Sequence, residues 1–174
     1  MKPKPGLPQN VRLSDWLAIA RAINGIPGDK AMTVVAFDGN SMAADRQGEF
    51  FCTKTDRTKI RRIGSIMVGC AGEARASEAV CKWLESGADV EMFPKIAESD
   101  KANVLVAGPN GLFLYENSPH PMQLENKFFA IGSGSDAAMA AMHLGCDAER
   151  AVEVACAVAT GCGGGVDVLV MANV

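Results

Sequence analysis

The sequence predicts an α+β fold, because segments patterned like β-strands and segments patterned like helices lie in separate blocks. Two turn signals sit in the first block, at residues 38–40 (Asp-Gly-Asn) and at Gly64, and a third lies at 109–111 (Pro-Asn-Gly). Each is flanked by short apolar runs, which is the signature of a hairpin. The separation favours either two antiparallel sheets or one sheet covered by helices, and it disfavours a regular βαβ repeat.

Each element follows from local pattern. The expected strands are 33–37, 41–45, 58–63, 65–70, 103–107, 112–116, 127–131 and 166–171. A helix is predicted over 73–84, because its apolar residues recur at helical spacing, and another over 136–144 for the same reason. Asp147 can accept hydrogen bonds from the first turn of a third helix, which should run to about residue 158.

The chain divides at residue 32. Residues 1–32 carry five Lys/Arg and two Asp/Glu, a net charge of +3, whereas residues 33–174 carry twelve and eighteen, a net charge of −6. Residues 1–10 are rich in proline and should be extended. A short helix is predicted over 14–24, capped by Ser14. We therefore expect an N-terminal extension over 1–32 and a single folded domain over 33–174.

Composition narrows the function classes. The chain has 174 residues and a net charge of −3, which favours neither nucleic acid nor an anionic membrane as a partner. The six cysteines form no Cys-x-x-Cys pair, and only two histidines are present, so no metal site is expected. No apolar run is long enough to span a membrane. The apolar neighbours of Cys70, Cys81 and Cys156 predict that these are buried free thiols, which are typical of a reducing, cytoplasmic location.

Five short stretches follow one another in an informative order. They are Thr33-Val-Val-Ala-Phe, Ser41-Met-Ala-Ala-Asp-Arg, Thr58-Lys-Ile-Arg-Arg-Ile, Gly69-Cys-Ala-Gly and Ala130-Ile-Gly-Ser-Gly-Ser. In their order and spacing they resemble the proteasome β-subunit and HslV-type family of N-terminal-nucleophile (Ntn) hydrolases, particularly its small bacterial or phage proteasome-like branch. The resemblance covers about residues 33–174. It implies a four-layer αββα sandwich preceded by a short N-terminal extension.

The residue types suit the chemistry of that family. A threonine hydroxyl needs a base to remove its proton, and at a chain terminus the residue's own α-amine, with a pKa of about 7.7–8.0, can serve. A lysine ammonium nearby favours the neutral amine, and a carboxylate holds the lysine. Thr33, Lys59 and Asp45 match these three roles, and we expect all three on adjacent early strands.

The resemblance assigns further positions. Gly72 matches the glycine whose backbone N–H stabilises the oxyanion, and Ser133 matches the serine that orients the terminal amine. Cys70 falls in the pocket for the substrate residue before the scissile bond. Cys162 and Gly163 match a supporting stretch near the nucleophile.

Two departures from the family pattern stand out. Ala159 occupies the position of a family aspartate, and Cys162 that of a serine. Thr33 is also internal in the sequence, so its nitrogen is a peptide nitrogen that cannot act as a base. Initiation at Met32 followed by methionine removal, or cleavage of residues 1–32 as a propeptide, would free it.

The sequence therefore predicts a threonine-type endopeptidase without a cofactor, acting on peptides or proteins. The resemblance implies a homo-oligomer, a ring or a related assembly, and allows an ATP-dependent unfoldase as partner. Two alternatives stay open: an inactive structural or assembly subunit, which Ala159 favours, and a small-molecule amidase on the same scaffold. The stretch Gly132–Ser135 resembles a phosphate-binding turn but lacks the third glycine and the lysine of nucleotide-binding loops.

Overall fold

Two antiparallel sheets form the centre of the molecule. The computed structural model describes residues 33–50 and 53–172; the predicted helix 14–24 and Cys52 lie outside them. One sheet has four strands in the order β10-β1-β2-β11, and the other has five in the order β5-β6-β7-β8-β9. The first sheet comprises β10 (Phe129–Ile131), β1 (Val35–Phe37), β2 (Ser41–Asp45) and β11 (Val166–Val170). The second comprises β5 (Ile60–Ile63), β6 (Ile66–Gly72), β7 (Ala102–Gly108), β8 (Gly111–Tyr115) and β9 (Met122–Leu124).

Two of the described helices, α2 and α4, begin at a side chain that caps their first turn. In α2 (Ala74–Glu85) the Glu73 side chain accepts a hydrogen bond from the backbone N–H of Arg75. In α4 (Ala148–Val158) the Asp147 side chain accepts one from Arg150, which confirms the predicted cap. The remaining described helices are α3 (Ser135–His143) and the short 3₁₀ helix η1 (Val90–Met92).

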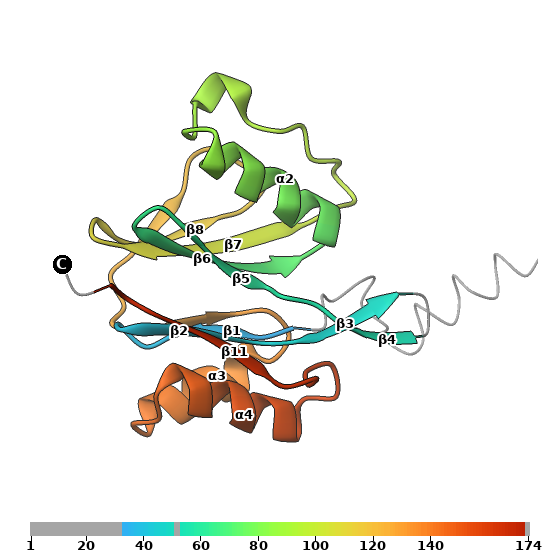
Figure 1. The fold of residues 1–174 in the computed structure, drawn as a ribbon, viewed down its shortest axis with the longest axis vertical. Coiled ribbons are helices and arrows are strands. Elements are labelled where there is room, and N and C mark those ends of the chain that lie inside the picture. Colours follow the sequence, from blue (N-terminus) through green and yellow to red (C-terminus); the bar gives the residue numbers. More distant parts are fainter. Residues whose placement is uncertain (1–32, 51–52, 173–174) are drawn as a thin grey trace, which may run out of the picture.

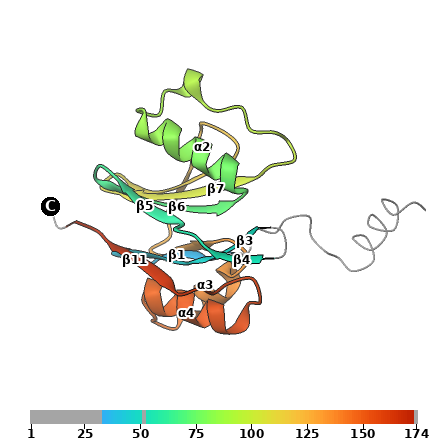
Figure 2. The same cartoon turned by 45° about the vertical axis from the view of Figure 1, so that its right-hand side comes forward.

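The elements stack in layers. In Figures 1 and 2, α2 lies over the outer face of the five-stranded sheet, and α3 and α4 lie under the outer face of the four-stranded sheet. Three groups of buried apolar residues fill the spaces between these layers. The central group packs the two sheets against each other and includes Val35, Met42, Met67 and Leu105, all fully buried.

Side chains along β6 show how the layers are held together. Met67 and Ala71 face the other sheet, whereas Val68 and Cys70 face α2, as expected from strand alternation. The Ser77 hydroxyl of α2 also donates a hydrogen bond to the Ala71 carbonyl. The end of β6 is therefore held by both the sheet interface and α2.

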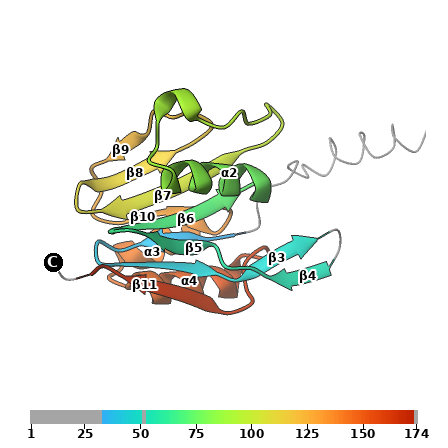
Figure 3. The same ribbon diagram turned by 45° about the horizontal axis from the view of Figure 1, so that its top comes forward.

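Three elements differ from the sequence prediction. The hairpin of β3 (Gln47–Phe50) and β4 (Thr53–Asp56), and the strand β9, were not predicted. The hairpin projects beyond the sheets (Figure 3), so its strands lack the alternation of apolar residues that a half-buried strand requires. The predicted strand 58–63 begins only at Ile60, and the predicted strand 33–37 only at Val35. Lys59 therefore immediately precedes β5, and Thr33 lies two residues before β1.

A helix needs about 20 apolar residues to cross a bilayer. No helix in the described part of the chain reaches that length and apolarity.

Candidate active site

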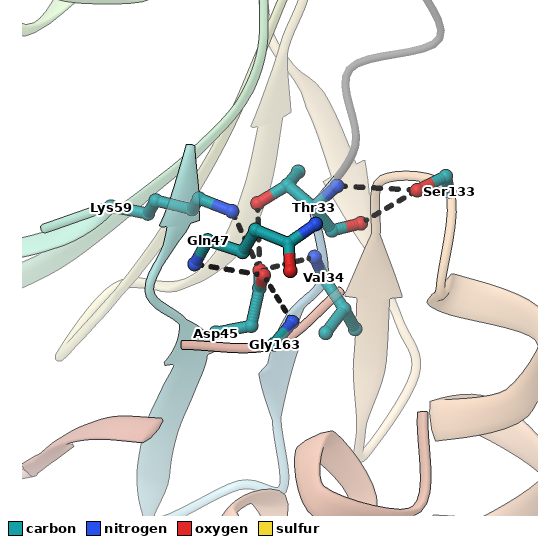
Figure 4. A network of polar contacts seen from close by, with 7 residues as sticks. All are labelled: Thr33, Val34, Asp45, Gln47, Lys59, Ser133 and Gly163. Atoms are coloured by element: carbon teal, nitrogen blue, oxygen red, sulfur yellow. Dashed lines mark hydrogen bonds and ion pairs between the residues drawn. The ribbon is translucent and has the colours of Figure 1, made fainter. Parts of the chain in front are cut away.

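Thr33 lies two residues before β1, and a carboxylate binds its side-chain hydroxyl. Only 3% of the residue is exposed. Its Oγ1 hydroxyl donates a hydrogen bond of 3.0 Å to Asp45 Oδ1, and its backbone N–H donates one of 3.2 Å to Ser133 Oγ (Figure 4). Because β1 and β2 are paired, Thr33 and Asp45 come to the same end of one sheet.

Asp45 is fully buried and collects donors from four different segments. Its Oδ1 accepts from Lys59 Nζ at 2.7 Å, from the Val34 N–H at 2.9 Å and from Thr33 Oγ1. Its Oδ2 accepts from the N–H groups of Gly163 at 3.0 Å and Gln47 at 3.3 Å. A buried carboxylate is stable only when it is paired in this way. Asp45 thus fixes the relative positions of the nucleophile candidate and the lysine.

Lys59 reaches the site from the other sheet. The sequence analysis placed Thr33, Asp45 and Lys59 on adjacent strands, and this is wrong for the lysine. Thr33 leads into β1 and Asp45 ends β2, both in the four-stranded sheet, whereas Lys59 precedes β5 at the edge of the five-stranded sheet. The strand β5 contacts both β2 and β11, so the two sheets meet at this point. The candidate site therefore lies between the sheets, where water is largely excluded.

Burial changes the protonation behaviour of this lysine. Desolvation lowers the pKa of Lys59, while its hydrogen bond and charge interaction with Asp45 oppose that change. A lysine with a lowered pKa loses its proton more readily than an exposed one. The surroundings of Lys59 therefore set how readily its ammonium group loses a proton.

Ser133 and Cys162 lie on the other side of Thr33. Ser133 precedes α3, and its hydroxyl donates to the Thr33 carbonyl at 3.3 Å, which the Gly134 N–H also contacts at 3.1 Å. The turn needs Gly132, which has φ of +95° and stands so close that a Cβ there would lie 2.4 Å from the Thr33 carbonyl oxygen. The thiol of Cys162 hydrogen-bonds with Ser133, and burial raises the pKa of Cys162.

The remaining predicted positions are near but not in this network. Gly72 ends β6 with φ of +102°, and Cys70 lies on the α2 side of that strand, with its Sγ 3.2 Å from Cys81 Sγ. The same strand meets β1, because a Cβ on Gly69 would lie 2.4 Å from the Val35 side chain. The structure thus brings together Thr33, Asp45, Lys59, Ser133, Cys162 and Gly163. Cys70 is joined to this group by its backbone N–H, which donates a hydrogen bond of 2.9 Å to the Lys59 carbonyl, whereas Gly72 pairs with Ala102 of β7.

One residue at the site was missed by sequence reasoning. Gln47 is 5% exposed and donates its backbone N–H to Asp45 and, at 2.7 Å, to the Gly163 carbonyl. The only signal in the sequence was its place two residues after Asp45, which brings both to one face of an extended chain. Among the described residues, no group of three or more His, Cys, Asp or Glu side chains could hold a metal ion.

Comparison with known proteins identifies the fold. No protein-family model and no curated protein matches the chain. The crystal structure of eukaryotic HslV from Trypanosoma brucei matches with a TM-score of 0.62 and 20% identity, over 81% of this chain and 99% of HslV.

The chain has the HslV fold. BPH from Thiobacillus denitrificans shares it too, with a TM-score of 0.58 and 23% identity over 82% of this chain and 100% of BPH. A second structure of BPH, in complex with epoxomicin, gives the same TM-score at 22% identity over 81% of this chain and 100% of BPH. The HslV-like fold thus accounts for about four-fifths of the chain.

Proposed function

We propose that this protein is a proteasome-like threonine peptidase of the Ntn-hydrolase class. The stacked layers then correspond to the four-layer αββα sandwich of that class. One observation carries the proposal: Thr33 Oγ1 shares Asp45 Oδ1 with the Lys59 ammonium, while the Thr33 nitrogen is held by Ser133. The hydroxyl and the nitrogen of Thr33 are thus both held in place, and the buried Lys59 cation binds the same carboxylate oxygen as the hydroxyl.

The proposed reaction is acyl transfer. The α-amine of a terminal Thr33 takes the proton from Oγ1, and Oγ1 attacks the peptide carbonyl. Backbone N–H of Gly72 stabilises the oxyanion, and the leaving amine takes the proton back as the peptide bond breaks. Water then hydrolyses the ester and frees the hydroxyl. Lys59 keeps the amine neutral by charge repulsion, and Asp45 holds Lys59 in place.

Processing at Thr33 is required for this chemistry. In the full sequence the Thr33 nitrogen belongs to a peptide bond and has no basic lone pair. We propose that the active form begins at Thr33, through initiation at Met32 or removal of residues 1–32. Intact mass and N-terminal sequencing of protein expressed from the native start region test this. A chain that begins at Thr33 supports a peptidase, and a chain that keeps residues 1–32 supports a structural subunit.

Substitution of the nucleophile tests the reaction itself. Thr33→Ala should abolish peptide cleavage and leave the circular dichroism spectrum unchanged, whereas Thr33→Ser keeps a hydroxyl and should retain activity. Lys59→Ala should reduce cleavage nearly as much as Thr33→Ala. Retained cleavage by the alanine variant at Thr33 would overturn the mechanism.

Epoxomicin offers a second test that does not need a known substrate. As an epoxyketone it presents two neighbouring electrophilic carbons, and the epoxomicin complex of BPH makes it a reasonable probe for a chain of the same fold. A chain that begins at Thr33 should gain the mass of one epoxomicin, mapped to Thr33. Thr33→Ala should gain none.

We further propose that peptides or unfolded proteins are the substrates, that the protein acts as a homo-oligomer in the cytoplasm, and that an ATP-dependent unfoldase can supply substrates. Small-molecule amide hydrolysis on the same scaffold is distinguished by assay. A peptidase cleaves unfolded casein, whereas an amidase cleaves only small amides.

A further inference from the structure

The side chain of Gln47 carries a buried donor without a partner. Its Nε2 is fully shielded from solvent and makes no hydrogen bond within the described part of the chain. Leaving such a donor unpaired destabilises the folded state. Buried unpaired groups are rare in folded proteins, and those that persist usually have a functional reason. The amide therefore invites the question of what it binds.

The position of Gln47 points to Thr33. Its backbone N–H is fixed on Asp45 Oδ2, and the opposite oxygen of the same carboxylate accepts the Thr33 hydroxyl. Its Oε1 passes close to Gly163, where a Cβ would lie 2.8 Å away. Figure 4 shows the amide extending past the Asp45 carboxylate toward Thr33. The unpaired end of the side chain thus lies on the nucleophile side of the site.

The bonding state of the Thr33 nitrogen explains why the amide lacks a partner. In the full chain this nitrogen is a peptide N–H, and its single hydrogen is donated to Ser133. It has nothing further to donate and no lone pair that accepts. When the chain begins at Thr33, the same nitrogen becomes an amine with additional hydrogens. These additional hydrogens can be accepted by the amide oxygen of Gln47, although not by its Nε2.

We propose that Gln47 is a positioning residue that binds the α-amine of Thr33 once that amine is freed. A half turn about the terminal bond of the side chain presents Oε1, which accepts one amine hydrogen. Ser133 holds another hydrogen, so the lone pair is left directed at Thr33 Oγ1. The inference rests on the proposed function, since it assigns Gln47 a task at that same site.

Several charged or titratable groups surround the amine, so the effect of Gln47 must be separated from theirs. They are Asp45 of β2, Lys59 just before β5, Cys162 in the loop before β11, and Arg57, whose charge acts on Lys59. None of them is altered by a substitution at Gln47. An acceptor on the ammonium stabilises the charged form, so removing Gln47 should lower the pKa of the α-amine.

The first experiment measures that pKa directly. A chain that begins at Thr33 is labelled with ¹⁵N-threonine, and the α-amine is titrated by NMR in the wild type, Gln47→Met and Gln47→Glu. The pKa should fall in Gln47→Met, which has the same length and no acceptor, and rise in Gln47→Glu, which adds a carboxylate. Gln123→Met, the same change at an exposed glutamine of β9, should leave it unchanged. Equal pKa values in wild type and Gln47→Met would overturn the proposal.

Thermal unfolding supplies a second readout with a change of sign. In the full chain Gln47→Met removes an unpaired amide, so Tm should stay the same or rise. In the chain that begins at Thr33 it removes a partner of the amine, so Tm should fall. A shift of the same sign in both chains would contradict the proposal.

Kinetics test the positioning role. Gln47→Met should lower kcat by about tenfold to a hundredfold with KM nearly unchanged, because the amine is misplaced while substrate binding is retained. Gln47→Glu should recover part of kcat and move the acid limb of the pH profile upward. Because the NMR titration needs no substrate, an inactive wild type would sink the peptidase function and still leave the Gln47 assignment decided.

Discussion

Asp45 is the residue on which the candidate site depends. Its two oxygens accept from Thr33, Val34, Lys59, Gln47 and Gly163, which come from both sheets and from the loop before β11. Each partner contributes one donor, and Lys59 also brings the compensating charge. Loss of this carboxylate should therefore disturb folding as well as chemistry.

We expect Asp45→Asn to lower the free energy of unfolding by about 3–5 kcal/mol, because it leaves the buried Lys59 ammonium without its counter-charge. Urea unfolding followed by circular dichroism measures this. Asp45→Asn combined with Lys59→Met should lose less than the sum of the single losses, because the double variant leaves no isolated charge. If the loss in the double variant equals the sum of the two single losses, Asp45 and Lys59 do not stabilise each other.

The lowered pKa of Lys59 predicts a pH dependence of stability. Between its pKa in the folded state and its ordinary value of 10.5, the unfolded chain binds more protons than the folded one. The free energy of unfolding therefore gains a contribution as pH rises through this window, fully present above 10.5 and lost as pH falls through the folded-state pKa. Urea titrations at several alkaline pH values should show this gain in the wild type. Lys59→Met should lack it, and identical slopes in the two proteins would contradict the explanation.

At the scale of elements, tight turns place the site residues. The turn between β10 and α3 brings Ser133 and the Gly134 N–H to the Thr33 backbone, and this approach requires Gly132 to have no side chain. Backbone atoms cannot yield as a flexible side chain can. A Cβ at this turn should therefore displace Thr33 itself.

Gly132→Ala has a matched control in Gly145→Ala. Both glycines have nearly the same φ, +95° and +94°, but a Cβ at Gly145 meets nothing within 4 Å. Gly145→Ala should cost only the left-handed conformation, about 1–2 kcal/mol. Gly132→Ala should cost about 4 kcal/mol or more and should abolish activity. Equal Tm losses in the two variants would mean that the turn moves freely.

At the scale of the whole molecule, large apolar side chains remain on the surface of the α3–α4 layer. Leu144 is 85% exposed and Val158 is 68% exposed. Leu144 directly follows α3 and Val158 ends α4. They fit the proposed homo-oligomer.

We expect light scattering to give a native mass several times that of one chain, and Leu144→Glu with Val158→Glu to reduce it. His143→Glu, which adds a charge at an exposed position in the same helix layer, serves as the control. An unchanged mass in the double variant would place the contacts elsewhere.

Much of the fold followed from local pattern. Turn residues at 38–40, Gly64 and 109–111 predicted the hairpins of β1–β2, β5–β6 and β7–β8, helical spacing predicted α2 and α3, and the Asp147 cap predicted α4. These signals are local, so one chain segment suffices to reveal them. The β3–β4 hairpin and β9 were missed because their strands are mostly exposed and carry no apolar alternation.

The sequence by itself determined the fold class, the Asp147 helix cap and, through a spaced set of residue types, the candidates Thr33, Asp45, Lys59 and Ser133. Only the tertiary structure decided that Lys59 comes from the opposite sheet, and that Gln47 is buried beside Asp45. The reason is physical: pattern and capping act between neighbours in the chain. Burial of an ion pair or an amide depends on segments that meet only when the two sheets pack together.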